Sequence, residues 1–337
     1  MRRGMQLSRL LRRAGIGIVP RMTQPDVPAI FDPRLVRAHR DRAAAGLARH
    51  DFLYREIADR LADRLLDVTR RFPLALDLGC HAGEFGQVAG DRGGIEFLVH
   101  CDPSPAMAHR AGSAAHTDVA GSAAHAQVAG SAAVAAEASA LPFAPGRFDL
   151  VVSNLSLHWV NDLPGALLQI RAALKPDGLF LAALPGGGTL GELRAVLTEA
   201  ELEITGGASP RIAPFIDPRD AGALLQRAGF ALPVVDADTI TVRYENAMRL
   251  MADLRGMGES NALVGMRRGF TRRDVLLRAA ELYRDRYSGP DGRVTASFQI
   301  VYLTGWAPDP SQQVPLAPGS ATARLGDLLN PDAFNEN

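Results

Sequence analysis

The sequence is poor in cysteine, in lysine and in long apolar runs. Its only cysteines, Cys80 and Cys101, lack the spacing of a metal-ligand or disulfide pair, which favours a reducing compartment. No run of about 18 apolar residues occurs, so we expect no membrane span. The formal net charge of zero argues against binding to nucleic acid. Lys175 is the only lysine among 37 cationic residues, an arginine bias that suggests a bacterial source.

The 337 residues suffice for one large α/β domain with additions. Residues 1–25 hold six arginines and no acid, which is typical of a mitochondrial transit peptide that directs a protein to the matrix. Because arginine is favoured throughout the chain, we interpret residues 1–29 instead as a disordered extension of a cytoplasmic bacterial protein. Residues 307–337 are rich in proline, serine and glutamine and are expected to form a disordered tail.

The most informative stretch is residues 74–83, which read Leu-Ala-Leu-Asp-Leu-Gly-Cys-His-Ala-Gly. An apolar run that ends in an acid and a glycine-bearing turn predicts a buried parallel strand leading into a helix. Gly79 and Gly83 lack a Cβ, so the backbone can turn sharply and approach a ligand closely. A second short strand, residues 98–102, ends at Asp102, where nucleotide-binding sheets place an acid that binds ribose hydroxyls.

Two further motifs follow the glycine turn and the strand that ends at Asp102. In this order, the four motifs resemble those of class I S-adenosylmethionine-dependent methyltransferases. Glu137 precedes Ala138 and a Leu-Pro-Phe sequence, and Phe-Asp-Leu-Val-Val-Ser at residues 148–153 predicts a fourth strand. The resemblance implies a doubly wound, Rossmann-like, mostly parallel α/β sheet that binds S-adenosylmethionine. The residues that it assigns to the cofactor are Asp77, Gly79, Cys80, Gly83, Asp102, Glu137, Ala138 and Asn154. One position departs from the pattern, because His81 stands where glycine is usual and brings a side chain to the cofactor's methionine end.

Periodicity and chain breakers outline the segments around this core. Residues 30–72 show an apolar stripe at helical spacing and predict a helical N-terminal segment. The cofactor-binding core then covers residues 73–185, and residues 186–306 complete the sheet and form a lid. Asp217 with Pro218 predicts one helix start, and Thr271 with Asp274 resembles a capping box for another.

Residues 111–137 contain three nine-residue units that each begin Ala-Gly-Ser-Ala-Ala. His116 and His125 recur in them, but no carboxylate or cysteine pattern accompanies these histidines as a metal site would require. We interpret the repeat as a duplication that lengthens the link before the third strand. Deleting residues 111–128 should then leave the fold nearly intact, because each doubling of loop length costs only about 0.6 kcal/mol.

The acceptor site is expected beyond the end of the fourth strand. Asn154, Ser156 and His158 alternate there and Trp159 follows, so these side chains line the cleft or, alternatively, cap the sheet against a helix. The segment 250–261 follows the core and is expected to fold over this end. From it, Arg255 and Glu259 would orient a polar acceptor together with His158. A guanidinium acceptor would need nearby acids, for which Glu259 and Asp253 are the candidates.

Segments before and after the core narrow the resemblance to one family within these methyltransferases. The chain is similar over residues 30–306 to the complex I assembly factor methyltransferase-like family, on the evidence of Ile30–Leu35, Ser153–Leu163, Gly188–Arg194 and Leu250–Asn261. It is similar, more distantly, to the malonyl-carrier-protein methyltransferases of biotin synthesis. The first resemblance implies hydroxylation of an arginine of a complex I subunit.

Hydroxylation needs an oxidant, normally a metal with two histidines and a carboxylate. His100 and Asp102 give a local His-x-Asp pattern, but Asp102 is assigned to ribose and no second histidine is placed nearby, so no metal site is predicted.

Three functions remain open from the residues and these resemblances. The first is a methyltransferase that acts on a protein or on an acid bound to an acyl carrier. The second is hydroxylation of a complex I arginine during assembly of that complex. The third is a cofactor-binding scaffold without catalysis, which the departure at His81 keeps open.

Overall fold

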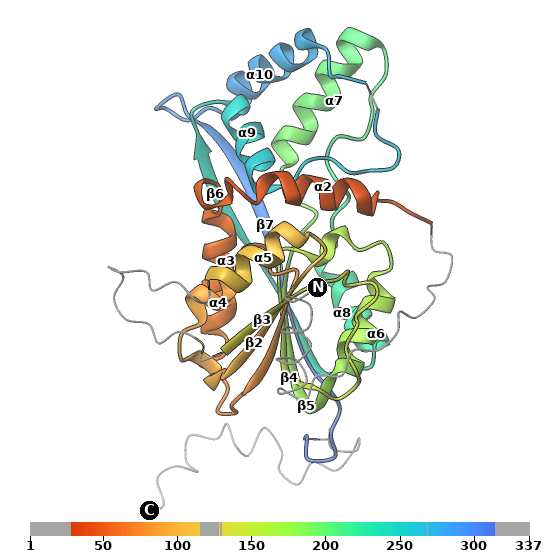
Figure 1. Cartoon of the computed structure of the whole chain (residues 1–337). Helices are drawn as coiled ribbons and strands as arrows, with labels where there is room; N and C mark the ends of the chain where they lie inside the picture. Colours follow the sequence, from red (N-terminus) through yellow and green to blue (C-terminus); the bar gives the residue numbers. More distant parts are fainter. Residues whose placement is uncertain (1–27, 115–127, 129, 268, 314–337) are drawn as a thin grey trace, which may run out of the picture.

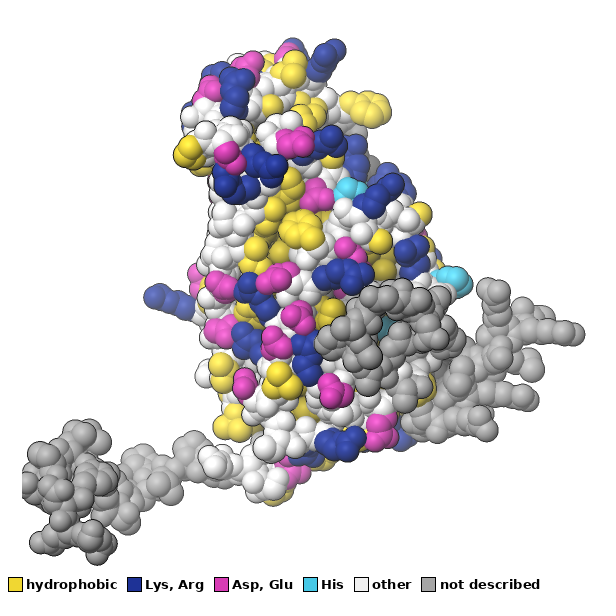
Figure 2. Space-filling view, turned by 90° about the vertical axis from the view of Figure 1, so that its left-hand side faces the viewer, with side chains coloured by type: hydrophobic (Ala, Val, Ile, Leu, Met, Phe, Trp, Pro, Cys, Tyr) yellow, Lys and Arg dark blue, Asp and Glu magenta, His cyan; other side chains and the backbone are white. Residues whose placement is uncertain are grey.

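A computed structural model describes residues 28–114, 128, 130–267 and 269–313 of the chain. Most of the predicted N-terminal extension and C-terminal tail lies outside these ranges, as do His116 and His125. Within the ranges, no helix combines the length and the apolar character needed to cross a membrane. On the face shown in Figure 2, acidic and basic side chains are interspersed, in keeping with the neutral composition.

Seven strands form one sheet in the order β3-β2-β1-β4-β5-β7-β6. The first five in this order are parallel, whereas β7 lies antiparallel to both β5 and β6. The strands are β1 (Leu74–Leu78), β2 (Phe97–Asp102), β3 (Gly130–Ala135), β4 (Phe148–Asn154), β5 (Leu174–Pro185), β6 (Ala231–Tyr244) and β7 (Val294–Trp306). The strand order reverses between β1 and β4, which is the switch point where open α/β sheets bind ligands. The sheet confirms the doubly wound, mostly parallel fold predicted from the sequence.

Helices cover both faces of this sheet, and a further group stands beyond its upper end in Figure 1. They are α2 (Pro33–Ala43), α3 (Phe52–Asp63), α4 (Glu84–Ala89), α5 (Pro105–Ala114), α6 (Leu163–Ala173), α7 (Gly191–Thr205), α8 (Pro218–Arg227), α9 (Ala247–Met257) and α10 (Arg273–Tyr287). On one face α3 and α4 bury Ile57 and Phe85, and on the other α6 and α8 bury Ile170 and Leu225. Because both faces are covered, the central strands are continuous apolar runs rather than alternating ones.

The N-terminal helical segment consists of two helices rather than one stripe. Asp32 caps α2 by accepting from the backbone N–H of Arg34 at 2.9 Å, and Pro33 occupies the first turn. A short 3₁₀ helix, Leu47–Arg49, separates α2 from α3. Both helices send buried side chains to the carboxyl edge of the sheet, where the site lies.

Both predicted helices form, as α8 and α10, but only one of the two predicted N-terminal caps does. Asp217 caps α8 by accepting from Arg219 N–H at 2.8 Å. No capping box precedes α10, because Asp274 pairs with the Arg272 side chain and the Thr271 hydroxyl accepts from Arg211 at 2.6 Å.

The repeat is built into the fold at both of its ends. Its first unit supplies the last turn of α5, where Ala111 is 1% exposed, and its third unit supplies β3. A Cβ on Gly112 of the first unit would lie 3.0 Å from Ala133 of the third, so the two units pack on each other. After deletion of residues 111–128, a single copy of the unit would have to serve both as the end of α5 and as β3. This argues against the expectation that the fold stays nearly intact, and thermal unfolding of the deletion variant would decide it.

Candidate functional site

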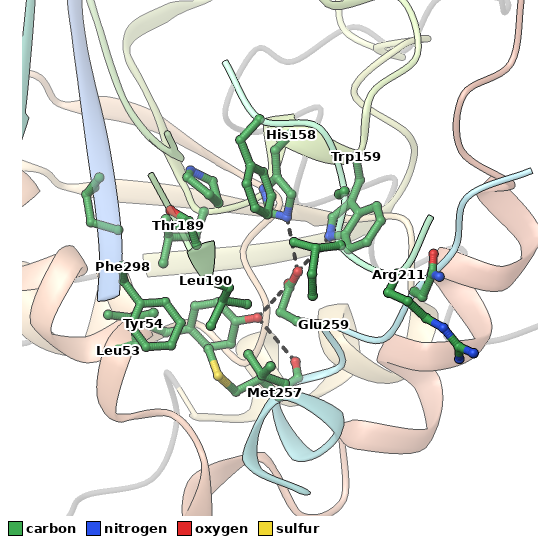
Figure 3. A pocket seen from close by; sticks show the side chains of 18 residues that line it. Leu53, Tyr54, His158, Trp159, Thr189, Leu190, Arg211, Met257, Glu259 and Phe298 are labelled. Atoms are coloured by element: carbon green, nitrogen blue, oxygen red, sulfur yellow. Dashed lines mark hydrogen bonds and ion pairs between the residues drawn. The ribbon is translucent and has the colours of Figure 1, made fainter. Parts of the chain in front are cut away.

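A small pocket, with a cavity volume of about 80 Å³, lies beyond the carboxyl ends of β4 and β5. Its walls are largely apolar and aromatic, formed by Leu53, Leu155, Trp159, Leu190, Ile212, Phe215, Leu254, Met257, Phe298 and Ile300. These residues come from segments far apart in the sequence, including α3, the loop after β4, α9 and β7 (Figure 3). The pocket is thus a product of tertiary packing at the predicted acceptor end of the sheet.

One carboxylate, Glu259, is held in this pocket by three donors. Its Oε2 lies 3.0 Å from His158 Nε2 and accepts from Trp159 Nε1 at 2.8 Å, while Oε1 accepts from the Tyr54 hydroxyl at 2.8 Å (Figure 3). The Glu259 side chain is 15% exposed and lines the pocket, so a ligand can reach it. Since a carboxylate offers about four lone-pair sites, Oε1 retains capacity for a further donor.

Glu259 stays ionised despite its partial burial. Burial would raise the pKa of this carboxyl group, but the adjacent His158, followed by the charge of Arg40, lowers the pKa to about 2. The pocket's other charge, Arg211, is neutralised by Glu201, whose Oε1 accepts from Arg211 Nη2 at 2.7 Å. In Figure 3 the Arg211 guanidinium points away from Glu259. Glu259 is therefore the carboxylate that faces the pocket, and its own ion-pair partner is His158 at 3.0 Å.

Three of the four predicted acceptor residues meet here, and the fourth does not. His158, Trp159 and Glu259 are in direct contact. Arg255 instead lines a second hollow with Arg42 and Arg49. Each of these arginines lies in the last turn of its helix, where a cation compensates the negative end of the helix dipole. This ordinary role accounts for the basic side chains of the second hollow.

Asp253, the other acid considered for a guanidinium acceptor, is also directed elsewhere. Its carboxylate lies 2.6 Å from His50 Nδ1 and accepts from the Tyr244 hydroxyl at 3.0 Å. Two residues that sequence reasoning missed, Tyr54 and Phe215, contribute to the pocket. Tyr54 belonged to the predicted apolar stripe, and the polar end of a tyrosine on a buried helix face was the available signal.

The predicted ribose acceptor, Asp102, is already occupied. Its side chain is 0% exposed, and Oδ2 accepts from Arg40 Nη1 at 2.8 Å and from the His81 N–H at 3.1 Å. Oδ1 accepts from the Ser104 N–H at 2.8 Å. Arg40 reaches this position from α2, and its Nη2 donates to Ser156 Oγ at 3.0 Å. A fully buried ion pair thus stands where sequence reasoning placed the cofactor's ribose.

The space expected for the cofactor's methionine end is filled by rings. His81 has a φ of 48°, is buried, and stacks on Tyr54 with ring centroids 4.0 Å apart. Its Nε2 lies 3.1 Å from the Asn154 carbonyl oxygen. Ser156 covers Gly79, because a Cβ at Gly79 would lie 1.9 Å from Ser156 Oγ. The His81 side chain, at the position where the resembling family usually has glycine, therefore points into the crevice that the cofactor would occupy, between β1, β2 and β4.

The remaining predicted cofactor residues surround this crevice. Gly83 has a φ of 90° and packs against α5, while Cys80 is buried at the turn. Asn154 donates through Nδ2 to the Tyr54 carbonyl oxygen at 2.8 Å. Glu137 and Ala138 are half-buried beyond the end of β3. In the described arrangement these residues do not fit S-adenosylmethionine, because its ribose acceptor and its methionine end are both taken by the chain itself.

One group in the described ranges has the donor set of a metal site. Asp77, Cys80 and His100 are buried, and their ligand atoms lie within 4.8 Å of one another. Carboxylate, thiolate and imidazole together suit zinc or iron. His100 Nδ1 lies 3.1 Å from Asp77 Oδ2, so His100 pairs with Asp77 and not with Asp102 as the local His-x-Asp pattern suggested.

Glu84, which begins α4, is expected to make stability fall as pH rises. It is 2% exposed, and burial, reinforced by the nearby Asp77, raises its pKa to about 8. A carboxyl group with a raised pKa favours folding below its ordinary pKa, and this contribution is lost between about pH 5 and pH 8. We expect Glu84→Gln to remove the loss and to be more stable than the wild type at about pH 8.5 by about 2–4 kcal/mol. Urea unfolding of both proteins at the two ends of this range is the measurement, and parallel pH profiles would contradict the assignment.

Comparison with known proteins agrees with this architecture. Residues 76–182 match the family described as methyltransferase domain, and the strand order with its antiparallel β7 defines a class I methyltransferase fold. The chain is 43% identical over 320 residues to "Arginine-hydroxylase NDUFAF5, mitochondrial" of Homo sapiens, covering 94% of this chain and 88% of that protein. It belongs to this NDUFAF5 family. It is also 34% identical over 276 residues to "Malonyl-[acyl-carrier protein] O-methyltransferase" of Halorhodospira halophila, covering 82% and 88% respectively.

Proposed function

We propose that this chain hydroxylates an arginine side chain of a protein substrate, which enters the pocket lined by Glu259, Trp159 and Phe215. The observation that carries the proposal is the ionised Glu259 carboxylate on the wall of an otherwise apolar pocket. The names of the relatives support it, since the NDUFAF5 proteins are called arginine hydroxylases. By the same family membership, a subunit of respiratory complex I is the proposed substrate.

The pocket's chemistry suits a guanidinium. Among the described residues, Glu259 Oε1 accepts from the Tyr54 hydroxyl alone, and it can accept an N–H of the incoming side chain. Aromatic walls on Trp159 and Phe215 offer faces on which a planar guanidinium stacks favourably. Trp159 is itself oriented, because its Nε1 donates to Glu259 and its ring packs edge-on against Phe31 with centroids 5.1 Å apart.

Hydroxylation requires more than binding. A C–H bond of the side chain is replaced by a C–O–H group that takes one atom of dioxygen, and the second atom leaves as water after a reductant supplies two electrons and two protons. The described residues contribute the binding, orientation and exclusion of water that such a step needs. Asp77, Cys80 and His100 have the donor set for a metal, but we assign no step to them.

Methyl transfer to a carrier-bound acid is the second candidate, on the strength of the malonyl-[acyl-carrier protein] O-methyltransferase relatives. An anionic acceptor would need a cation in the pocket. Arg211 lines it, yet both ends of its guanidinium are engaged, by Glu201 at 2.7 Å and by Thr271 at 2.6 Å. The negative charge of Glu259 would repel a carboxylate. The electrostatics therefore favour a cationic acceptor.

The test is mass spectrometry of proteins from cells that lack the chain, complemented with the wild type or with variants. We expect one arginine to lose the mass of one oxygen atom on deletion and to regain it with the wild type and with Arg255→Ala. Trp159→Ala should restore little or none, because it removes an aromatic wall and a donor to Glu259. Loss of a methylene mass from a protein or an acyl carrier would support methyl transfer instead. Equal rescue by both variants would exclude this pocket as the acceptor site.

A further inference from the structure

Arg40 occupies an unusual place for an arginine. Its side chain is 1% exposed and projects from the last turn of α2 into the crevice between β1, β2 and β4. There it satisfies Asp102 and Ser156, at 2.8 and 3.0 Å. An arginine is almost never fully buried unless it is paired, so the contact with Asp102 is what allows this position.

The contact competes directly with the predicted role of Asp102. The carboxylate already accepts from Arg40, from the His81 N–H and from the Ser104 N–H, and no part of it is exposed. Ribose hydroxyls would need the same oxygens. A cofactor ribose and the Arg40 guanidinium therefore cannot use Asp102 at the same time.

Several buried polar atoms of the closed crevice have no hydrogen-bond partner. The described residues include nine buried side-chain nitrogen or oxygen atoms without a hydrogen-bond partner, and four of them belong to this region. These four are Arg40 Nε, Asp77 Oδ1, His81 Nδ1 and Asn154 Oδ1. Buried polar atoms in a permanent core are nearly all paired, because each unmade hydrogen bond costs free energy. Each of these atoms calls for an explanation, and a second arrangement in which a ligand reaches them would supply their partners.

We infer that Arg40 is an internal ligand of Asp102 that holds the cofactor site of this methyltransferase fold closed, so that an adenosyl cofactor binds only when Arg40 leaves. His81 supports the closed arrangement by donating its backbone N–H to Asp102 and by filling the methionine end with its ring. In such a two-state site the apparent affinity for cofactor is reduced by the fraction of molecules that are open. The inference concerns the cofactor site alone and does not depend on arginine being the acceptor.

Isothermal titration calorimetry with S-adenosylhomocysteine on the full chain tests this. We expect weak binding to the wild type and at least about tenfold tighter binding to Arg40→Met, which keeps an unbranched apolar stem and removes the competing guanidinium and its charge. His81→Gly, which opens the other end and leaves the ion pair intact, should also bind more tightly. The matched control is Arg37→Met, one turn earlier on α2, where the arginine is exposed and should leave affinity unchanged.

The outcomes separate cleanly. Tighter binding by Arg40→Met and His81→Gly, with Arg37→Met like the wild type, supports the closed site. Weaker binding by Arg40→Met would make Arg40 a ligand of the cofactor and overturn the inference, as would unchanged or absent binding in both variants. Thermal unfolding of each variant verifies that it is folded, and His81→Gly keeps the test valid if Arg40→Met is not. Because binding is read without any acceptor, failure here leaves the arginine modification untouched.

Discussion

Asp102→Ala is expected to lower the free energy of unfolding by about 3–5 kcal/mol, because it leaves the guanidinium of Arg40 buried without a counter-charge. The variant also removes the acceptor for the Ser104 and His81 N–H groups. Had Asp102 been a free ribose ligand, as the sequence alone suggested, its removal would weaken cofactor binding and leave stability nearly unchanged. Urea denaturation of the wild type and the variant measures the difference.

The control for this prediction is an ion pair on the surface. Glu199 pairs with Arg286 at 2.6 Å, but both side chains are more than a third exposed, so Glu199→Ala should lower the free energy of unfolding far less than Asp102→Ala does. A loss for Asp102→Ala that is no larger than this would show that the buried pair contributes nothing special. It would also remove the main support for a closed cofactor site.

Glu259→Gln should abolish modification of the target arginine while leaving the chain folded. Gln keeps the shape of Glu259 but removes the charge that holds the guanidinium, and truncating one partner of a buried charge pair costs about 2–5 kcal/mol. That corresponds to a loss of about 30-fold or more in binding. The measurement is the rate of modification of a substrate peptide or protein, followed by mass spectrometry.

Asp253→Asn is the matched comparison for Glu259→Gln. Both acids lie in the predicted lid segment, but Asp253 is bound by His50 and Tyr244 and does not line the pocket. We expect Asp253→Asn to modify arginine at nearly the wild-type rate. Equal loss in the two variants would assign both effects to the lid's structure and not to recognition of the guanidinium.

Many of the strands and strand ends that surround the site could be predicted from the local sequence. The apolar run before Gly79 predicted β1, and the acid-terminated run before Asp102 predicted β2, because buried parallel strands leave a signal that needs no partner to be read. Parallel strands place their carboxyl ends at one edge, so His158 and Trp159 could be assigned to a cleft. The approach of Glu259 to them was expected because its segment follows the core and should fold over this end of the sheet.

Contacts across long stretches of chain were not predictable in this way. The pairing of Arg40 with Asp102 joins residues separated by 62 positions, and nothing in either local sequence indicates it. The departure at His81 was visible, but not the direction of its ring, which depends on Tyr54 from another helix. Arg255 and Glu259 are four residues apart yet face different hollows, because the first lies in the last turn of α9 and the second lies beyond the Gly258 cap of that helix.

The repeat separates what the sequence by itself determined from what only the tertiary structure decided. The core motifs and their family resemblance implied the class of fold, and the local pattern of apolar residues and glycines predicted the glycine turn. Yet the same Gly-Ser-Ala triplet is helical at residues 112–114 and a strand at residues 130–132. Small residues have weak propensities for helix or strand, so the packing partner decides which of the two forms. Residues 112–114 continue α5, whereas residues 130–132 lie along the edge of β2 and complete its hydrogen bonds. The contents of the cofactor crevice were decided in the same manner, by side chains that only the folded chain brings together.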